Sequence, residues 1–216
     1  MSKTPAQRAR KHGNRAAVAP GARAGQPANP TTQRTPRQAE GNAKLIIIAG
    51  LVASAFMFWY LHLLTLQQMT QLSGGLAMPD SLVGGFSPEY IAQLAGAMNA
   101  DALGQLNYVH KTAGTIFPLA AGFTFLLVFG TWLTAKALRW AAFALVAAFA
   151  VVRLWGNVAI DAALASPADT GAAVLASVLV VLGWAFLLLM LAGAGATVLV
   201  AQRRARAAAR EGTPRR

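Results

Sequence analysis

The sequence predicts an all-α integral membrane protein: a four-helix bundle with a disordered basic N-terminal tail and an external amphipathic helix. Three observations support this fold class. Hydrophobic residues make up 56% of the 216 residues, which is high for a water-soluble domain. Four apolar stretches each reach the roughly 20 residues that a helix needs to cross a ~30 Å hydrocarbon core. Lysine and arginine are concentrated on one side of the predicted bundle.

The four apolar stretches define the transmembrane domain, which we place at residues 44–201. The predicted spans cover residues 45–66, 112–135, 140–160 and 172–200. Three of these spans contain no charged residue, and the third span is interrupted only by Arg153. Residues 67–111 form the predicted external helical loop, and residues 202–216 form a basic cytoplasmic tail.

Residues 1–43 form a polar tail that is rich in Pro, Gly, Ala and Arg. The tail has almost no large apolar side chain, so it cannot bury enough surface to offset the entropy that ordering would cost. We therefore predict that it is disordered. No small-residue cleavage site follows the first apolar stretch, which is accordingly predicted to be a retained membrane anchor.

The distribution of charge predicts the orientation of the spans. Seventeen of the 19 lysines and arginines lie before the first span, after the fourth span, or in the short loop between the second and third spans. Five of the seven acids lie on the opposite side, so the positive-inside rule places both termini in the cytoplasm. The basic tails are expected to attract anionic lipid of the bilayer. They contain no aromatic residue for stacking on bases, so nucleic acid is not expected as a partner.

The long loop at 67–111 contains two helix start signals. Ser87 can cap a helix whose first position is Pro88, and Asn99 or Asp101 can cap a second helix that continues into the second span. The first of these helices places its apolar residues on one face: Ile91, Leu94, Ala95 and Met98. Such a helix is expected on the bundle surface or at the membrane interface, either as a lid over the bundle mouth or as a ligand-binding cap.

The same loop resembles the first external loop of small uncharacterised four-span bacterial integral membrane proteins. The matching residues are Asp80, Gly85, Phe86, Ser87, Gly104, Tyr108, Phe117 and Pro118. The resemblance implies the four-span fold and the bacterial cytoplasmic membrane, and it implies no activity. Those relatives often carry acids and an asparagine in the third span, where Asn157 matches but Arg153 and Gly156 stand in place of acids.

Arg153 predicts a polar layer inside the bundle. An unpaired arginine in lipid costs at least about 2.5–3.5 kcal/mol. Helix side chains lean toward the helix N-terminus, which for this span is the cytoplasmic side, so an outward path to water works against the lean. The rise per helical residue places polar residues from three spans at a similar depth. The predicted polar layer comprises Arg153, Asn157, Asp161, His62, His110 and Thr115.

This layer has two main interpretations, besides an arginine that merely snorkels to the membrane surface. In the first, Arg153, Asn157 and Asp161 form a hydrogen-bonded network, and the chain is a non-catalytic accessory or structural membrane protein. In the second, the layer lines an outward-facing pocket or path that binds or transports a small ligand. Catalysis is not expected, since no nucleophile motif, phosphate loop or pair of intramembrane carboxylates occurs.

No cofactor and no metal site are predicted. The chain has no cysteine, which removes thiolate and iron–sulfur sites. His62 and His110 are the residues that a haem would need as axial ligands, and haem or quinone is left open as an alternative. Glu89, Asp101 and His110 match the spacing of no known metal site.

Small residues in the second and fourth spans predict close helix contacts. Gly122 and Gly130 lie eight residues apart, and Ala192 and Ala196 flank Gly193. We expect these residues to pack within the bundle, with a homo-oligomer or another membrane protein as the alternative partner.

Overall fold

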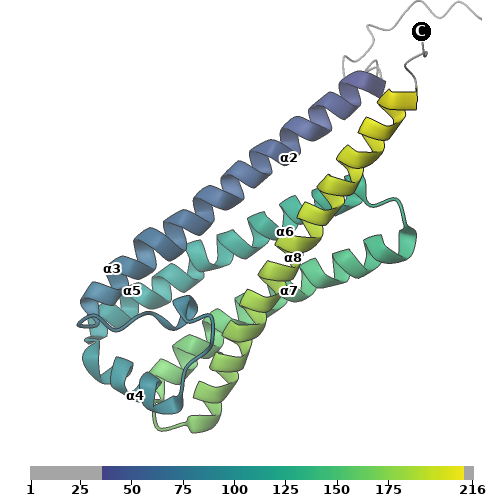
Figure 1. Ribbon diagram of the computed structural model, residues 1–216. Coiled ribbons are helices and arrows are strands. Elements are labelled where there is room, and N and C mark those ends of the chain that lie inside the picture. The colour runs from purple at the N-terminus through teal and green to yellow at the C-terminus, as the bar shows by residue number, and fades with distance from the viewer. Residues whose placement is uncertain (1–35, 212–216) are drawn as a thin grey trace, which may run out of the picture. The chain divides into compact units, whose positions relative to one another are not determined.

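The computed structural model describes the backbone of residues 36–211, which is built of helices and loops without a β-strand (Figure 1). Four helical segments are long and apolar enough to cross a membrane: Gly41–Leu72, Ala100–Trp132, Lys136–Ala165 and Thr170–Arg203. This confirms the predicted all-α fold class with four candidate spans. The predicted disordered tail covers residues 1–43, and positions 1–35 of it lie outside the described part of the chain.

The first span is longer at both ends than its apolar residues predict. It consists of α2 (Pro36–Phe58), η2 (Trp59–Thr65) and α3 (Leu66–Leu72), which follow one another without a break. The helix therefore includes residues 36–43, which the sequence assigned to the tail, and it continues six residues past the predicted end. Past the predicted end, the glutamines at 67, 68 and 71 favour a helix and carry no apolar signal.

The middle segment of this span, η2, is a π-helix. A π-helical turn is wider than an α-helical turn and leaves carbonyl groups displaced from their usual partners. One of them is satisfied locally, because the Thr65 hydroxyl donates to the Tyr60 carbonyl oxygen at 2.9 Å. The π-helix carries His62, and π-helical turns are frequent at functional sites.

The loop after α3 turns at two glycines and contains a 3-10 turn, η3 (Pro79–Ser81), and the helix α4 (Pro88–Ala97). Gly74 and Gly75 have φ angles of +70° and +97°, a region that residues with a Cβ rarely adopt. α4 begins as predicted, since the Ser87 hydroxyl accepts from the Tyr90 amide at 3.3 Å. Its apolar face is buried, with Ile91 and Leu94 fully enclosed.

The second span begins at α5 (Ala100–Lys111) and continues as α6 (Ala113–Trp132). As predicted, Asn99 caps a helix that continues into the second span: its side chain accepts from the Ala102 amide at 2.8 Å, and α5 begins 12 residues before the apolar stretch that starts at 112. The two helices are separated only by Thr112. Its φ of −107° and ψ of −93° are not helical and interrupt the helical hydrogen-bond pattern. This interruption lies two residues after His110.

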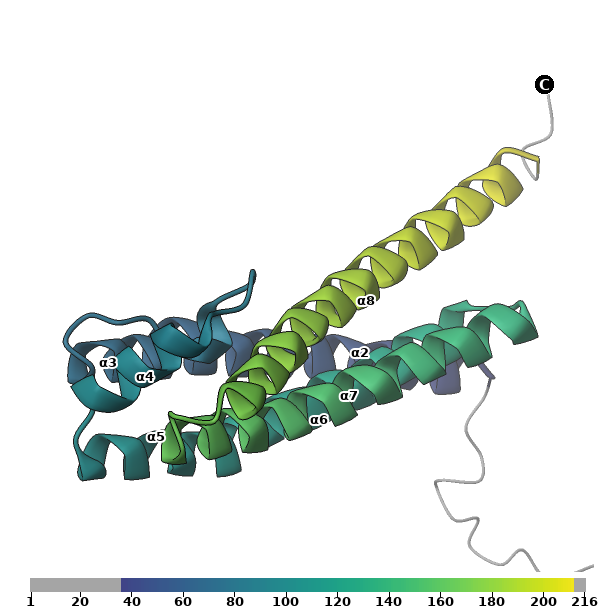
Figure 2. The ribbon, with the colours of Figure 1, turned by 90° about the horizontal axis from the view of Figure 1, so that it is seen from below.

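The third and fourth spans are α7 (Lys136–Ala165) and α8 (Thr170–Glu211). α7 lies along both α6 and α8, and α4 covers one end of α7 and α8 (Figure 1). Toward its C-terminal end α8 diverges from α6 and α7 (Figure 2). The C-terminal residues 202–211, predicted as a tail, continue α8.

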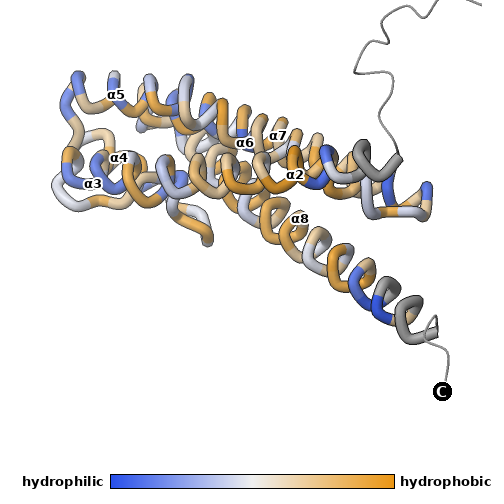
Figure 3. Tube along the Cα trace, turned by 90° about the horizontal axis from the view of Figure 1, so that it is seen from above, coloured by the Kyte–Doolittle hydropathy of each residue, from blue (hydrophilic) through white to orange (hydrophobic). Residues whose placement is uncertain are grey.

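Large apolar side chains are exposed along the spans. Apolar residues predominate in the helices between their ends (Figure 3). The exposed fraction is 64% for Val52, 62% for Phe123 and 64% for Val158. Exposed apolar surface on this scale is typical of helices that face lipid.

Three of the predicted small-residue contacts, at Gly122, Gly130 and Gly193, lie inside the bundle, whereas Ala192 and Ala196 are exposed. A Cβ atom at Gly122 would lie 3.6 Å from Val146 of α7, and one at Gly130 would lie 3.5 Å from Phe143. A Cβ atom at Gly193 of α8 would lie 3.6 Å from the Phe129 ring of α6. An added Cβ atom at these positions would make ordinary van der Waals contact with the neighbouring span, so the three glycines lie at helix–helix contacts, as the intramolecular interpretation predicts.

Candidate functional site

A group of polar and charged side chains is enclosed at the end of the bundle where η2, η3, α5 and α7 meet. We call it the charged cluster, and its members are His62, Asp80, Asn107, His110, Arg153, Asn157 and Asp161. The exposed fraction is 2% for His110, 3% for Asp80 and 6% for Arg153. Buried groups of this kind need partners, because an unpaired buried charge is costly.

His110 is the centre of the charged cluster. Its Nε2 atom lies 2.9 Å from Asp80 Oδ2, and its Nδ1 atom lies 2.6 Å from Asp161 Oδ1. Both carboxylates accept, so both hydrogen bonds are satisfied together only when each ring nitrogen carries a proton. His110 is therefore an imidazolium held between two carboxylates. The amide of Asn107 donates to the second oxygen of Asp161 at 2.7 Å.

Arg153 closes the cluster on the side of the first span. Its Nη2 atom lies 3.7 Å from Asp80 Oδ1 and 3.3 Å from His62 Nε2. Arginine only donates, so His62 Nε2 accepts and the His62 ring is neutral. The two cations, His110 and Arg153, thus balance the two carboxylates, and the cluster as a whole carries no net charge.

His62 lies in an aromatic pocket beside the cluster. Its ring stacks on Phe58 with centroids 4.5 Å apart and meets the edges of Trp184 and Phe117 at 5.3 and 5.6 Å. Its Nδ1 atom is buried and has no hydrogen-bond partner among the described residues. The ring therefore offers one unused donor at the boundary of the cluster.

The chain supplies Asp80 from a loop that is fastened to α8 at two points. The Trp184 indole donates to the Asp80 carbonyl oxygen at 3.0 Å, and the Phe86 amide donates to the Ser177 hydroxyl at 2.8 Å. The Tyr90 hydroxyl of α4 adds a third bond, to the Ala77 carbonyl oxygen at 2.7 Å. These bonds hold the acid-bearing turn against the spans.

The break between α5 and α6 also serves the cluster. It frees the His110 carbonyl oxygen, which accepts from the Thr115 hydroxyl at 2.9 Å and from the Asn157 amide at 3.3 Å. Asn157 fits only because position 114 is glycine: a Cβ atom there would lie 2.8 Å from Asn157 Nδ2. The backbone at His110 is thereby fixed from both α6 and α7.

Gly183 provides the space for Arg153, and its replacement by alanine is expected to destabilise the protein. A Cβ atom at Gly183 would lie 2.6 Å from Arg153 Cδ, so the arginine would have to leave its partners. Overpacking of a filled core costs about 1–3 kcal/mol. The free energy of unfolding in mixed micelles should fall by this amount for Gly183→Ala. The matched control is Gly195→Ala, where an added Cβ atom meets no other helix of the described residues within 4 Å and stability should not fall.

Acidification is expected to weaken the fold through Asp80. Burial opposes ionisation of this carboxyl group, but the adjacent His110 and Arg153 outweigh burial and hold its pKa below the ordinary value of 3.8. The stabilisation from a lowered pKa is present above the ordinary value and is lost as the pH falls toward the folded-state value. Between about pH 7 and pH 3, Asp80→Asn should therefore lose less stability than the wild type. Equal losses in both proteins would contradict this assignment.

All six residues of the predicted polar layer belong to this region. His62, His110, Arg153, Asn157 and Asp161 are members of the charged cluster, and Thr115 binds the His110 carbonyl oxygen. Arg153, Asn157 and Asp161, which were predicted to form a network, are joined through His110 and Asp80 rather than directly. Among the described residues, Arg153 pairs with Asp80 and His62, not with Asn157 or Asp161, because those two side chains face α5 from higher turns of α7. Surface snorkelling of Arg153 does not fit its burial.

Three residues of the site were missed from the sequence. Asp80 appeared only in the family resemblance, and Asn107 and Trp184 did not appear at all. Asp80 and Asn107 were assigned to an external loop, and nothing in their spacing shows that this loop folds back among the spans. The charge of Asp80 could have identified it, because a buried arginine requires an acidic partner. The loop at 67–111 contains only three acids: Asp80, Glu89 and Asp101.

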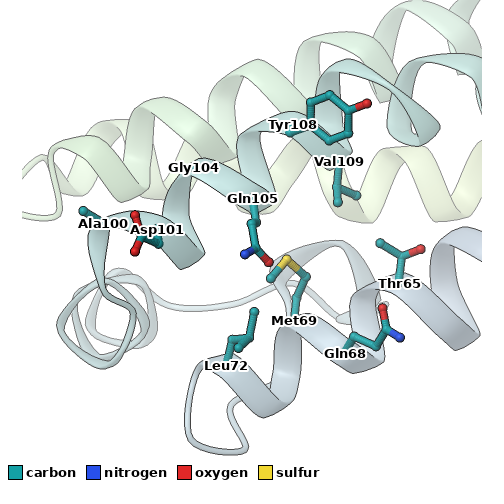
Figure 4. Close-up of a pocket in the computed structure, with 10 residues that line it drawn as sticks. All are labelled: Thr65, Gln68, Met69, Leu72, Ala100, Asp101, Gly104, Gln105, Tyr108 and Val109. Atoms are coloured by element: carbon teal, nitrogen blue, oxygen red, sulfur yellow. The ribbon is translucent and has the colours of Figure 1, made fainter.

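Two grooves are present elsewhere on the described part of the chain. One, of about 620 Å³, lies between α3 and α5, where Gln105 and Met69 point toward one another (Figure 4). The other, of about 760 Å³, lies between α8 and the α6–α7 connection at the opposite end of the spans. Neither groove is lined by a member of the charged cluster.

The donor atoms of the cluster do not fit a haem. An axial haem ligand needs a ring nitrogen that is not already bonded to another side chain. Both ring nitrogens of His110 face carboxylates, and His62 Nε2 faces Arg153. The two histidines therefore do not form a pair of axial ligands. Glu89 and Asp101 are exposed and lie apart from the buried His110. Comparison of the chain with protein-family models, curated proteins and solved structures gives no match.

Proposed function

We propose that this chain is a multi-pass protein of the bacterial cytoplasmic membrane with a structural or accessory role rather than a catalytic one. The closed charged cluster carries this proposal: its two cations face its two carboxylates, and the cluster lines neither of the two grooves. Such a network fastens the loop with Asp80 to the spans. The proposal includes kinship with the small four-span bacterial membrane proteins that residues 78–119 resemble.

The ligand content of the purified protein tests this role. We expect extracts of the denatured protein to contain phospholipid and no stoichiometric small polar ligand, quinone or haem. Arg153→Lys keeps the charge but loses the planar five-donor fork, so a ligand bound at the cluster would be lost in this variant. A compound that is present in the wild type and in Arg139→Lys, but absent from Arg153→Lys, would overturn the structural role.

One observation favours the alternative, an outward-facing site that binds or transports a small ligand. His62 Nδ1 is a buried donor without a partner among the described residues, and Asp161 retains 22% exposure of its side chain. A small acceptor could bind His62 from within the bundle. The extraction experiment separates the two functions, since this alternative requires a ligand whose retention depends on Arg153.

The proposed orientation has both termini in the cytoplasm and the Asp80 loop outside, as the charge distribution indicates. The chain contains no cysteine, so single cysteines can report the side of the membrane. On intact cells, an impermeant thiol reagent should label Val83→Cys in the exposed part of the loop and should leave Ser2→Cys and Thr213→Cys unlabelled. Labelling of a tail cysteine without labelling of Val83→Cys would reverse the orientation.

A further inference from the structure

The larger groove lies at the end of the spans opposite to the charged cluster. It forms where α8 diverges from α6 and α7 (Figure 2), and its volume is about 760 Å³. Its lining is largely apolar and includes Leu133, Leu138, Leu145, Leu189, Ala196 and Val200. Several of these side chains are open to the groove: Leu138 is 56% exposed, Leu189 55% and Val200 46%. An apolar surface of this kind requires an apolar occupant.

Basic residues stand on both sides of this groove. On one side, Lys136 and Arg139 begin α7 and alternate in sequence with the lining residues Ala135 and Leu138. On the other side, Arg203 of α8 follows the last lining residue, Ala201, by two positions. No acid occurs within residues 132–145 or 189–207. The groove therefore combines an apolar wall with a positively charged rim.

The rim lies at a level that suits a lipid headgroup. Trp132 lines the groove and Trp140 is the fifth residue of α7, and tryptophan is enriched where membrane meets water. The first turn of α7 has no side-chain cap, so its backbone amides add to the positive potential. Basic side chains from both sides of the groove are thus available to a phosphate at this level, while an acyl chain extends along the apolar wall.

We propose that the groove binds an anionic phospholipid, with an acyl chain on the apolar wall and the phosphate held by Lys136, Arg139 and Arg203. The charges favour this occupant over a second copy of the chain. A second copy inserted in the same orientation would bring its own three basic residues to the same level, and like charges repel. An anionic lipid instead neutralises the rim.

Retention of lipid by the full chain tests the proposal. The protein is reconstituted in vesicles of equal parts phosphatidylglycerol and phosphatidylcholine, extracted in mild detergent and weighed by native mass spectrometry. The wild type should retain phosphatidylglycerol in excess over phosphatidylcholine. Lys136→Gln with Arg139→Gln should reduce the excess on the order of fivefold for each basic side chain removed. Lys111→Gln, at the opposite end of the spans, should leave the excess unchanged.

The apolar wall is tested by filling the groove. Ala196→Phe should reduce the lipid retained per chain, whereas Gly195→Phe, at an exposed position that does not line the groove, should retain the wild-type amount. If Ala196→Phe does not fold, Val200→Phe fills the same groove. Equal retention by the groove-filling and control variants would overturn the proposal. So would equal retention of the two lipids by the wild type, or lipid-free dimers that the groove-filling variants abolish.

Discussion

Replacing Arg153 with leucine is expected to reduce the free energy of unfolding by about 3–5 kcal/mol. The substitution leaves His110 as the only cation facing two carboxylates, so one buried negative charge has no counterion. Removal of one partner of a buried ion pair is costly for this reason, even where lipid itself would favour leucine. The measurement is reversible unfolding in mixed micelles with an increasing fraction of a denaturing detergent.

Two variants control for the loss of an arginine and for its shape. Arg206→Leu removes an exposed arginine of α8 that belongs neither to the charged cluster nor to the proposed lipid site, and it should change stability little. Arg153→Lys keeps the charge without the planar fork and should fall between the wild type and Arg153→Leu. Wild-type stability in Arg153→Leu would show that the arginine is not part of a buried charge balance.

Removal of the acid should release the loop that carries it. In Asp80→Ala the cluster keeps two cations and one carboxylate, so the turn at η3 loses its electrostatic attachment to α5 and α7. We expect local opening of residues 76–87 to become easier by about 3 kcal/mol or more, which corresponds to roughly 100-fold faster amide hydrogen exchange. Hydrogen exchange followed by mass spectrometry measures this directly.

The matched control for this experiment is Asp101→Ala. Asp101 is an exposed acid of the same type on the first turn of α5, outside the charged cluster. Its removal should leave exchange in residues 76–87 at the wild-type rate. Faster exchange in both variants would mean that the loop responds to general loss of negative charge. Unchanged exchange in Asp80→Ala would mean that Trp184 and Ser177 hold the loop without the ion pairs.

The number and composition of the spans could be predicted because hydropathy over about 20 residues is a strong local signal. The ends of the spans could not be predicted equally well. α3 and α5 extend the first two spans through residues such as Gln68 and Gln105, which favour a helix without being apolar. The signals that fix the ends are caps and turns, and of these Ser87 and Asn99 were recognised in the sequence while Gly74 was not.

The members of the polar layer were predictable by depth, since a helix rises by a fixed amount per residue. Their pairing was not, because it depends on how the spans rotate about their axes and on where the loop goes. His110 and Asp161 form the shortest hydrogen bond of the cluster. The sequence predicted that these two residues lie at a similar depth, but not that they bond to each other. Asp80 is distant in sequence from both, and only the folded loop brings it between His110 and Arg153.

The central claim is that the two buried cations and two buried carboxylates balance one another. A double-mutant cycle between Asp80 and Arg153 tests it most directly. Each single variant, Asp80→Asn and Arg153→Leu, leaves one charge unbalanced, whereas the double variant restores neutrality with His110 and Asp161. The account predicts that the loss in free energy of unfolding is smaller for the double variant than the sum of the losses of the two single variants, by about 1–3 kcal/mol. Losses that add within about 0.5 kcal/mol would contradict it.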